Sequence, residues 1–150
     1  MELREACPGD APVIDRLYSL LVPGDDAICL RPDRIVEIGA DPCNFLFVVE
    51  DGRRAVGATA FLTLCLDPMY GDRPFAVLEN IIVDPSRRRA GVGRFLLQGI
   101  ESFCWIRGCT KIMLLSAASR TDAHRFFEGS GFSGHKKVAF VKYRGENALK

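Results

Sequence analysis

Residues 83–97 read "VDPSRRRAGVGRFLL", and this stretch decides how the whole chain is interpreted. It follows an apolar, β-branched run, passes three arginines and two glycines, and continues into an apolar pattern typical of a helix. Glycine lets a backbone approach a ligand closely, and the start of a helix has unpaired N–H groups that suit an anion such as pyrophosphate. The pattern therefore predicts a strand, an anion-binding loop and a helix. A solvated, basic helix start explains the same residues equally well.

Other uses of a stretch rich in glycine and arginine fit less well. The dinucleotide fingerprint G-x-G-x-x-G needs a small residue where Leu96 stands, and the Walker A pattern is absent from the sequence. Binding of RNA or DNA through Arg87–Arg89 is disfavoured, because the net charge is only +1 and no cluster of exposed aromatic residues is evident. We therefore expect a local anion site, no nucleic-acid partner, and a solvated Arg87.

The composition indicates one globular domain over residues 1–150. Hydrophobic residues make up 48% of the chain and charged residues 26%, which argues against disorder. No apolar run is long enough to span a membrane, and the first ten residues lack the apolar core of a signal peptide. The six cysteines form no C-x-x-C pair and there are two histidines, so we expect a reduced, cytoplasmic protein without a metal or a membrane partner.

The hydrophobic periodicity divides the chain into helices and strands. Helical patterns cover residues 8–21, 31–38, 91–107 and 121–130. Strand patterns cover residues 2–7, 44–50, 55–66, 75–83, 111–117 and 136–144. An Asp-Gly pair at 51–52 predicts an antiparallel hairpin, and the helix between the fourth and fifth strands predicts that these two are parallel. We expect an α/β fold in which helices cover both faces of a mixed sheet.

Two motifs carry a resemblance to a known family. Residues 88–93, "RRAGVG", match the pattern R/Q-x-x-G-x-G/A, with Val83 and Pro85 upstream and "LL" at 96–97 downstream. Residues 120–132, "RTDAHRFFEGSGF", resemble the pattern N/R-x-x-A-x-x-F-Y-x-x-x-G-F. On these motifs and on its order of elements, nearly the whole chain resembles the GNAT-superfamily N-acetyltransferases.

The resemblance implies a fold and a cosubstrate. The GNAT fold has a mixed, mostly antiparallel central sheet of six to seven strands flanked by about four helices, and acetyl-CoA binds where two parallel strands splay apart. By resemblance, residues 81–83 would bind the pantetheine arm and the backbone of 88–94 the pyrophosphate. The implied cofactor-binding residues are Ile81, Ile82, Val83, Arg88, Arg89, Ala90, Gly91, Val92, Gly93, Arg94, Arg120, Ala123 and Phe127.

Glu79 is the leading candidate for a catalytic residue. In a regular strand it shares a face with Val77, Ile81 and Val83, so that a charge interrupts an apolar face. A salt-bridged strand glutamate is one interpretation. The interpretation that the resemblance favours is a general base that acts through water on the acceptor amine, with the backbone N–H of Ile81 as donor to the developing oxyanion.

One position departs from the family pattern. Phe127 stands where the resemblance implies a tyrosine that protonates the departing thiolate, and Ser119, His124 and Tyr143 are possible substitutes. The departure leaves a catalytically silent acyl-CoA-binding domain as the alternative to an enzyme. The expected partners are acetyl-CoA, an amine acceptor of unidentified structure, and a second copy of the chain in a homodimer.

Overall fold

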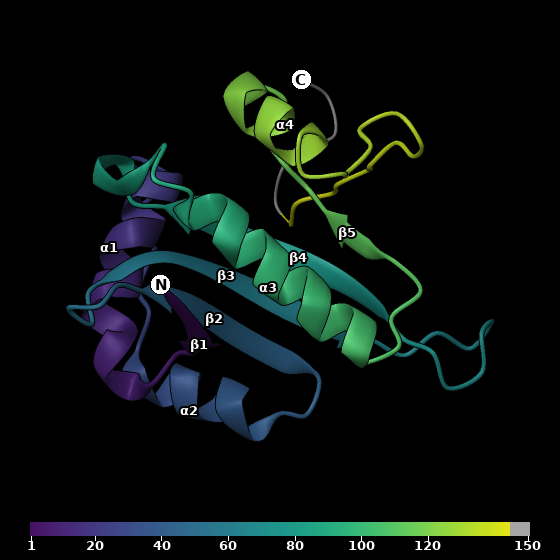
Figure 1. The fold of residues 1–150 in the computed structure, drawn as a ribbon, viewed down its shortest axis with the longest axis horizontal. Coiled ribbons are helices and arrows are strands. Elements are labelled where there is room, and N and C mark those ends of the chain that lie inside the picture. The colour runs from purple at the N-terminus through teal and green to yellow at the C-terminus, as the bar shows by residue number, and fades with distance from the viewer. Residues whose placement is uncertain (145–150) are drawn as a thin grey trace. The chain divides into compact units, whose positions relative to one another are not determined.

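A mixed sheet of five strands forms the centre of the structure, a computed structural model that describes residues 1–144 (Figure 1). The strands lie in sequence order: β1 (Glu2–Glu5), β2 (Asn44–Glu50), β3 (Val56–Cys65), β4 (Phe75–Val83) and β5 (Ile112–Leu114). Neighbouring strands are antiparallel from β1 to β4, and β5 pairs parallel to β4. The α/β class and the mixed, mostly antiparallel sheet are therefore confirmed.

Helices cover both faces of this sheet, as the periodicity predicts. On one face, α1 (Ala11–Leu21) and α2 (Pro32–Ala40) bury Ile14, Leu17 and Ile35 in one cluster with side chains of β2 to β4. On the other face lies α3 (Val92–Ile106), whose Phe103 ring makes edge contacts with Phe45 and Phe47 of β2 at 4.8 and 5.2 Å between centroids. None of the helices in residues 1–144 is long and apolar enough to cross a membrane.

The chain divides into two compact units, Met1–Leu114 and a second unit that starts at Leu115. The first unit holds the whole sheet with α1, α2 and α3. Within the described part of the second unit, the regular element is α4 (Thr121–Glu128).

The number of strands differs from the six to seven that were expected, because residues 136–144 are not a strand. Their alternating pattern suits a pleated segment, but a strand also needs a neighbour that accepts and donates its backbone hydrogen bonds. No strand pairing among the described residues includes this segment, and the side chain of Phe140 is 92% exposed. The predicted strand over 111–117 is likewise shorter and ends at Leu114.

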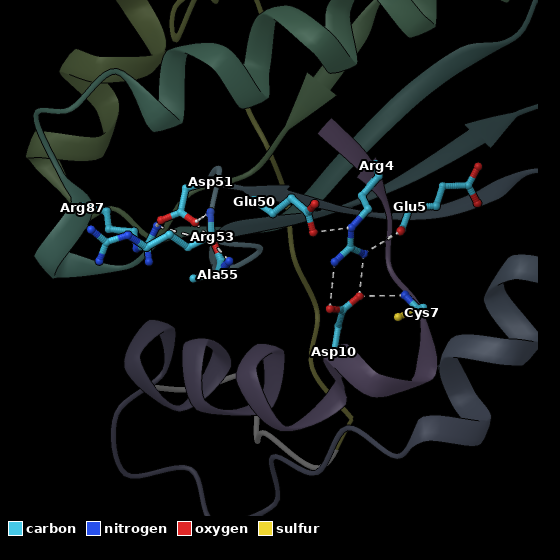
Figure 2. A network of polar contacts seen from close by, with 9 residues as sticks. All are labelled: Arg4, Glu5, Cys7, Asp10, Glu50, Asp51, Arg53, Ala55 and Arg87. Carbon is cyan, nitrogen blue, oxygen red and sulfur yellow. Dashed lines mark hydrogen bonds and ion pairs between the residues drawn. The ribbon is translucent and has the colours of Figure 1, made fainter. Parts of the chain in front are cut away.

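A polar network fixes the start of α1 to the sheet (Figure 2). The Arg4 guanidinium donates to Asp10 Oδ2 at 2.7 Å and to Glu50 Oε2 at 2.8 Å. Asp10 Oδ2 also accepts from the Cys7 N–H at 2.8 Å, and these contacts hold the pKa of Asp10 below its ordinary value. The cluster joins β1, β2 and the residue that precedes α1, so it fixes where this helix begins relative to the sheet.

Candidate active site

An irregularity in β4 determines where the candidate base lies. Phe61 of β3 faces Glu79 of β4, whereas Thr59 faces Ile82, so two β4 residues stand opposite Ala60 alone. One of these two, Asn80, has a left-handed backbone with φ of +54°, which Asn tolerates better than most side chains. An extra residue of this kind is a β-bulge, and it re-aims the side chains that follow it.

The bulge overturns the predicted face of Glu79. Cross-strand neighbours share a face, and Phe61 packs with the α1 and α2 cluster, so Glu79 points to the same side as these helices. Beyond the bulge it is Ile82 that belongs to this cluster. Regular alternation predicts that Ile81 and Val83 share the face of Glu79. They lie on the opposite face instead, because the extra residue of the bulge shifts the alternation by one.

Glu79 is half-buried and forms no salt bridge within residues 1–144. Its side chain makes no hydrogen bond or ion pair with any residue in the described part of the chain. Burial raises the pKa of this carboxyl above its ordinary value, because a charged carboxylate loses hydration. The interpretation of Glu79 as a salt-bridged strand glutamate thus has no support, and the arrangement is one that suits proton transfer.

The parallel pair β4 and β5 holds together over a short length. Residue pairing runs from Ala76 opposite Ile112 to Leu78 opposite Leu114, and within the first unit it stops there. Further along β4, the Asp84 N–H donates to the Gly57 carbonyl of β3 at 2.9 Å. Because backbone groups alternate in direction along a strand, those of Val83 point to the edge opposite β3.

The loop after β4 is anchored by Asp84, a residue that the sequence analysis did not single out. Its Oδ1 accepts from the Ser86 N–H at 3.0 Å and from the Ser86 hydroxyl at 2.7 Å, which closes the 3₁₀ turn Pro85–Arg87. Its Oδ2 accepts from the Arg16 guanidinium of α1 at 2.6 Å. These bonds lower the pKa of Asp84 to about 2. An Asp two residues before a Ser is a common turn signal, but the bond to Arg16 depends on the fold.

Residues 88–94 form the predicted loop and helix start. Arg89 and Gly91 both have left-handed backbones, with φ of +64° and +79°, and Gly91 precedes the first residue of α3 without a side-chain cap. The first bond of this helix start runs from the Phe95 N–H to the Gly91 carbonyl at 2.9 Å, so the amides of 92–94 have no partner within the helix. Three N–H groups at the positive end of a helix dipole suit an anion.

The charges around this helix start are available to a ligand, with one exception. Arg88, Arg89 and Arg94 are exposed and form no ion pair with any described residue. Arg87, predicted to be solvated, is instead bound: it donates to Asp51 Oδ2 at 2.6 Å (Figure 2). The pKa of Asp51 falls to about 2, first because of the Arg87 hydrogen bond and then because of backbone donors. Arg87 therefore ties the loop to the β2–β3 turn.

The remaining predicted site residues lie in the second unit. Arg120 precedes the first residue of α4 and accepts a hydrogen bond from the His124 N–H at 3.1 Å. Ala123 is half-buried, and Phe127 is buried against the Phe132 ring, 6.2 Å away between centroids. That Arg120, Ala123 and Phe127 bind the same cofactor as the α3 helix start stays a prediction.

Cys104 of α3 is buried, and its thiol is perturbed. Burial raises the pKa of the Cys104 thiol to about 12, which leaves it protonated at neutral pH. Within residues 1–144, no group of His, Cys, Asp or Glu side chains is arranged to hold a metal ion.

Comparisons with known proteins agree with this arrangement. A curated relative, the glucosamine 6-phosphate N-acetyltransferase of Trypanosoma brucei brucei, is 31% identical over 86 residues, which are 56% of this chain and 54% of that protein. An aminoglycoside N(6')-acetyltransferase type 1 of Acinetobacter genomosp. 13 is 30% identical over 69 residues, which are 46% of this chain and 47% of that protein. The chain spans about half the length of these curated relatives.

A solved structure extends the similarity to the whole fold. A protein of Agrobacterium tumefaciens str. C58 that has been assigned as an acetyltransferase superposes with a TM-score of 0.84 at 28% identity, over 95% of this chain and 100% of that one. The model of the acetyltransferase (GNAT) family matches residues 14–132, which include both motifs. The family resemblance is confirmed, and the chain belongs to the acetyltransferase (GNAT) family.

Proposed function

We propose that this protein is an N-acetyltransferase that moves the acetyl group of acetyl-CoA directly to a primary amine of a small molecule or peptide. One observation carries the proposal: a half-buried Glu79, without a partner among residues 1–144, lies in the strand that leads into a cradle of amides left unpaired by the α3 helix. The family match runs across the boundary at Leu114, which supports a single working domain over residues 1–150.

The residues around the α3 helix start fit the far end of acetyl-CoA. A Cβ added at Gly91 would meet no atom within 4 Å, so the space beside the unpaired amides is open. The guanidinium groups of Arg88, Arg89 and Arg94, which pair with no described carboxylate, can neutralise phosphates. In the proposed complex the amides of 92–94 bind the pyrophosphate, and the pantetheine arm binds the backbone groups of β4 that point away from β3, such as those of Val83. When bound, acetyl-CoA supplies an activated acyl thioester.

Glu79 would remove the proton that keeps the amine unreactive. An alkyl ammonium has a pKa near ~10, so it reaches the enzyme protonated, and a carboxylate of ordinary pKa is a weak base for it. Burial raises the pKa of Glu79 toward that of the ammonium, and a smaller difference between the two pKa values makes proton transfer through a water easier. The N–H of Ile81, the second residue of the bulge, is the proposed donor to the carbonyl oxygen as that oxygen becomes negative.

The thiolate that leaves needs no strong acid. A thiol has a pKa near ~8.5, so its anion is a tolerable leaving group in water. The ring of Phe127 cannot supply a proton, and it is this buried phenylalanine that favours the second candidate function, an acyl-CoA-binding domain without turnover. The two candidates share the cofactor cradle and differ in whether Glu79 ever receives a proton.

Thiol release separates the two candidates. The protein is incubated with acetyl-CoA and a panel of primary amines, and free thiol is followed for the native chain, Glu79→Gln and the control Glu5→Gln, an exposed glutamate in β1. We expect Glu79→Gln to lower kcat/KM by about 100-fold or more, as for removal of a general base, and Glu5→Gln to change it less than twofold.

The same variants are then tested for binding by thermal stabilisation. CoA should raise the Tm of the native chain and of Glu79→Gln equally, because the cradle does not include the carboxyl. Stabilisation without thiol release from any amine would overturn the enzyme and favour the silent binding domain. If neither CoA nor acetyl-CoA stabilised the native chain at millimolar concentration, both candidates would be wrong.

A further inference from the structure

A pocket lies where the end of α1 and the connection to α2 meet the β4 bulge. The pocket is open to solvent, and its volume is about 230 Å³. Its walls include Tyr18, Leu21, Val22, Ile28, Leu30 and Asn80. Leu30 is held in place because its N–H donates to Asp15 Oδ1 of α1 at 2.6 Å, so one wall of the pocket is fixed to the helix.

The pocket and the proposed base lie on the same face of the sheet. Asn80 lines the pocket and directly follows Glu79 in the bulge. Phe61, which stands opposite Glu79, packs against the same cluster as Tyr18 and Leu30. A molecule whose body occupies the pocket can therefore present a nitrogen to the Glu79 carboxyl without leaving this face.

The lining carries no ionised side chain. Burial raises the pKa of Tyr18 to about 12, so its phenol is neutral at neutral pH. The other walls are apolar except for the Cys29 thiol and the Asn80 amide. Such a surface stabilises hydrocarbon by removing it from water, but it offers no charged partner to a phosphate or to a second ammonium group, whose burial is unfavourable without one.

We propose that the acceptor is a primary amine on an apolar body, such as an arylalkylamine, and that this body fills the pocket while the nitrogen lies at Glu79. The inference rests on the proposed function, because it assigns the acceptor side of that site. It distinguishes this chain from relatives whose names specify glucosamine 6-phosphate and an aminoglycoside as acceptors, both of them highly polar molecules.

Acceptor preference is the first test. We expect kcat/KM for 2-phenylethylamine to exceed that for glucosamine 6-phosphate and for kanamycin by at least tenfold. Acetylation of either polar amine as efficiently as 2-phenylethylamine would overturn this inference and leave the proposed function intact. Absence of thiol release from every amine would overturn the proposed function, and the binding test that follows would then decide the pocket assignment by itself.

The second test places a charged side chain in the wall of the pocket. Val22 is 49% exposed in the pocket rim, and Val36 of α2 is 58% exposed and not part of the lining, so Val22→Asp and Val36→Asp form a matched pair. With CoA present, 2-phenylethylamine should raise the Tm of the native chain and of Val36→Asp. Val22→Asp should weaken this stabilisation and raise KM about tenfold, with the response to CoA alone unchanged. Equal behaviour of the two variants would show that the amine binds elsewhere.

Discussion

The ion pair of Asp84 with Arg16 stabilises the loop after β4, and its strength follows from the structure. The pKa of Asp84 is about 2 rather than 3.8, and each pKa unit corresponds to about 1.36 kcal/mol. The interactions of the carboxylate with Arg16 and Ser86 together therefore stabilise the folded state by at most about 2.4 kcal/mol. Part of this belongs to Ser86, and the Arg16 side chain is 52% exposed, so solvent screens the pair. We therefore expect a coupling free energy of about 1 kcal/mol.

A double-mutant cycle measures this coupling. Asp84→Asn keeps an oxygen for Ser86 and removes the charge, and Arg16→Met keeps the apolar stem. Urea unfolding of the four proteins at pH 7 gives the coupling free energy. The pKa of Asp84 is lowered on folding, so its contribution is complete above pH ~4 and is lost as the pH falls toward ~2. A coupling below about 0.3 kcal/mol at pH 7 would refute the assignment.

Three further predictions concern the helix start, the core and the thiols. Gly91→Ala should lower the free energy of unfolding by about 1 kcal/mol, because φ is +79° there, and an unchanged urea midpoint would contradict this. Leu96→Ala removes a fully buried side chain of α3 and should cost about 3 kcal/mol, seen as a fall in Tm of roughly 10 °C; a fall under ~3 °C would argue against the packing. Iodoacetamide at pH 8 should modify the exposed Cys7 and Cys29 but not Cys104, whose pKa is about 12, and mass spectrometry of the peptides would reveal any exception.

Sequence patterns predicted a helix or strand well where its formation depends on residues nearby in the chain. The apolar stripe over 91–107 predicted α3, which runs from Val92 to Ile106, and the strand predicted over 44–50 coincides with β2. The Asp-Gly pair predicted the β2–β3 hairpin, yet the left-handed residue in its turn is Arg54, not Gly52. The Asp51 carboxylate accepts from two backbone N–H groups of the turn and selects a longer loop than the two-residue form.

Sequence patterns failed where the local structure depends on a partner that is distant in the chain. Residues 136–144 alternate like a strand, but alternation supplies only half of what a strand needs, and no described strand pairs with them. The predicted face of Glu79 assumed a regular pleat. The bulge at Asn80 breaks that pleat, and it is defined by the register with β3 and not by the residues of β4 alone.

The sequence by itself determined the family, the strand–loop–helix order around residues 83–97, and the presence of an acidic residue four positions before that stretch. These features depend on propensities and spacings that act over a few residues. Only the tertiary structure decided that Glu79 has no partner among the described residues, that Arg87 is bound to Asp51, and that an apolar pocket opens beside Asn80. The reason is physical: these contacts join segments such as Arg87 and Asp51, 36 residues apart, or Asp84 and Arg16, 68 apart, and only the folded sheet brings them within hydrogen-bond distance.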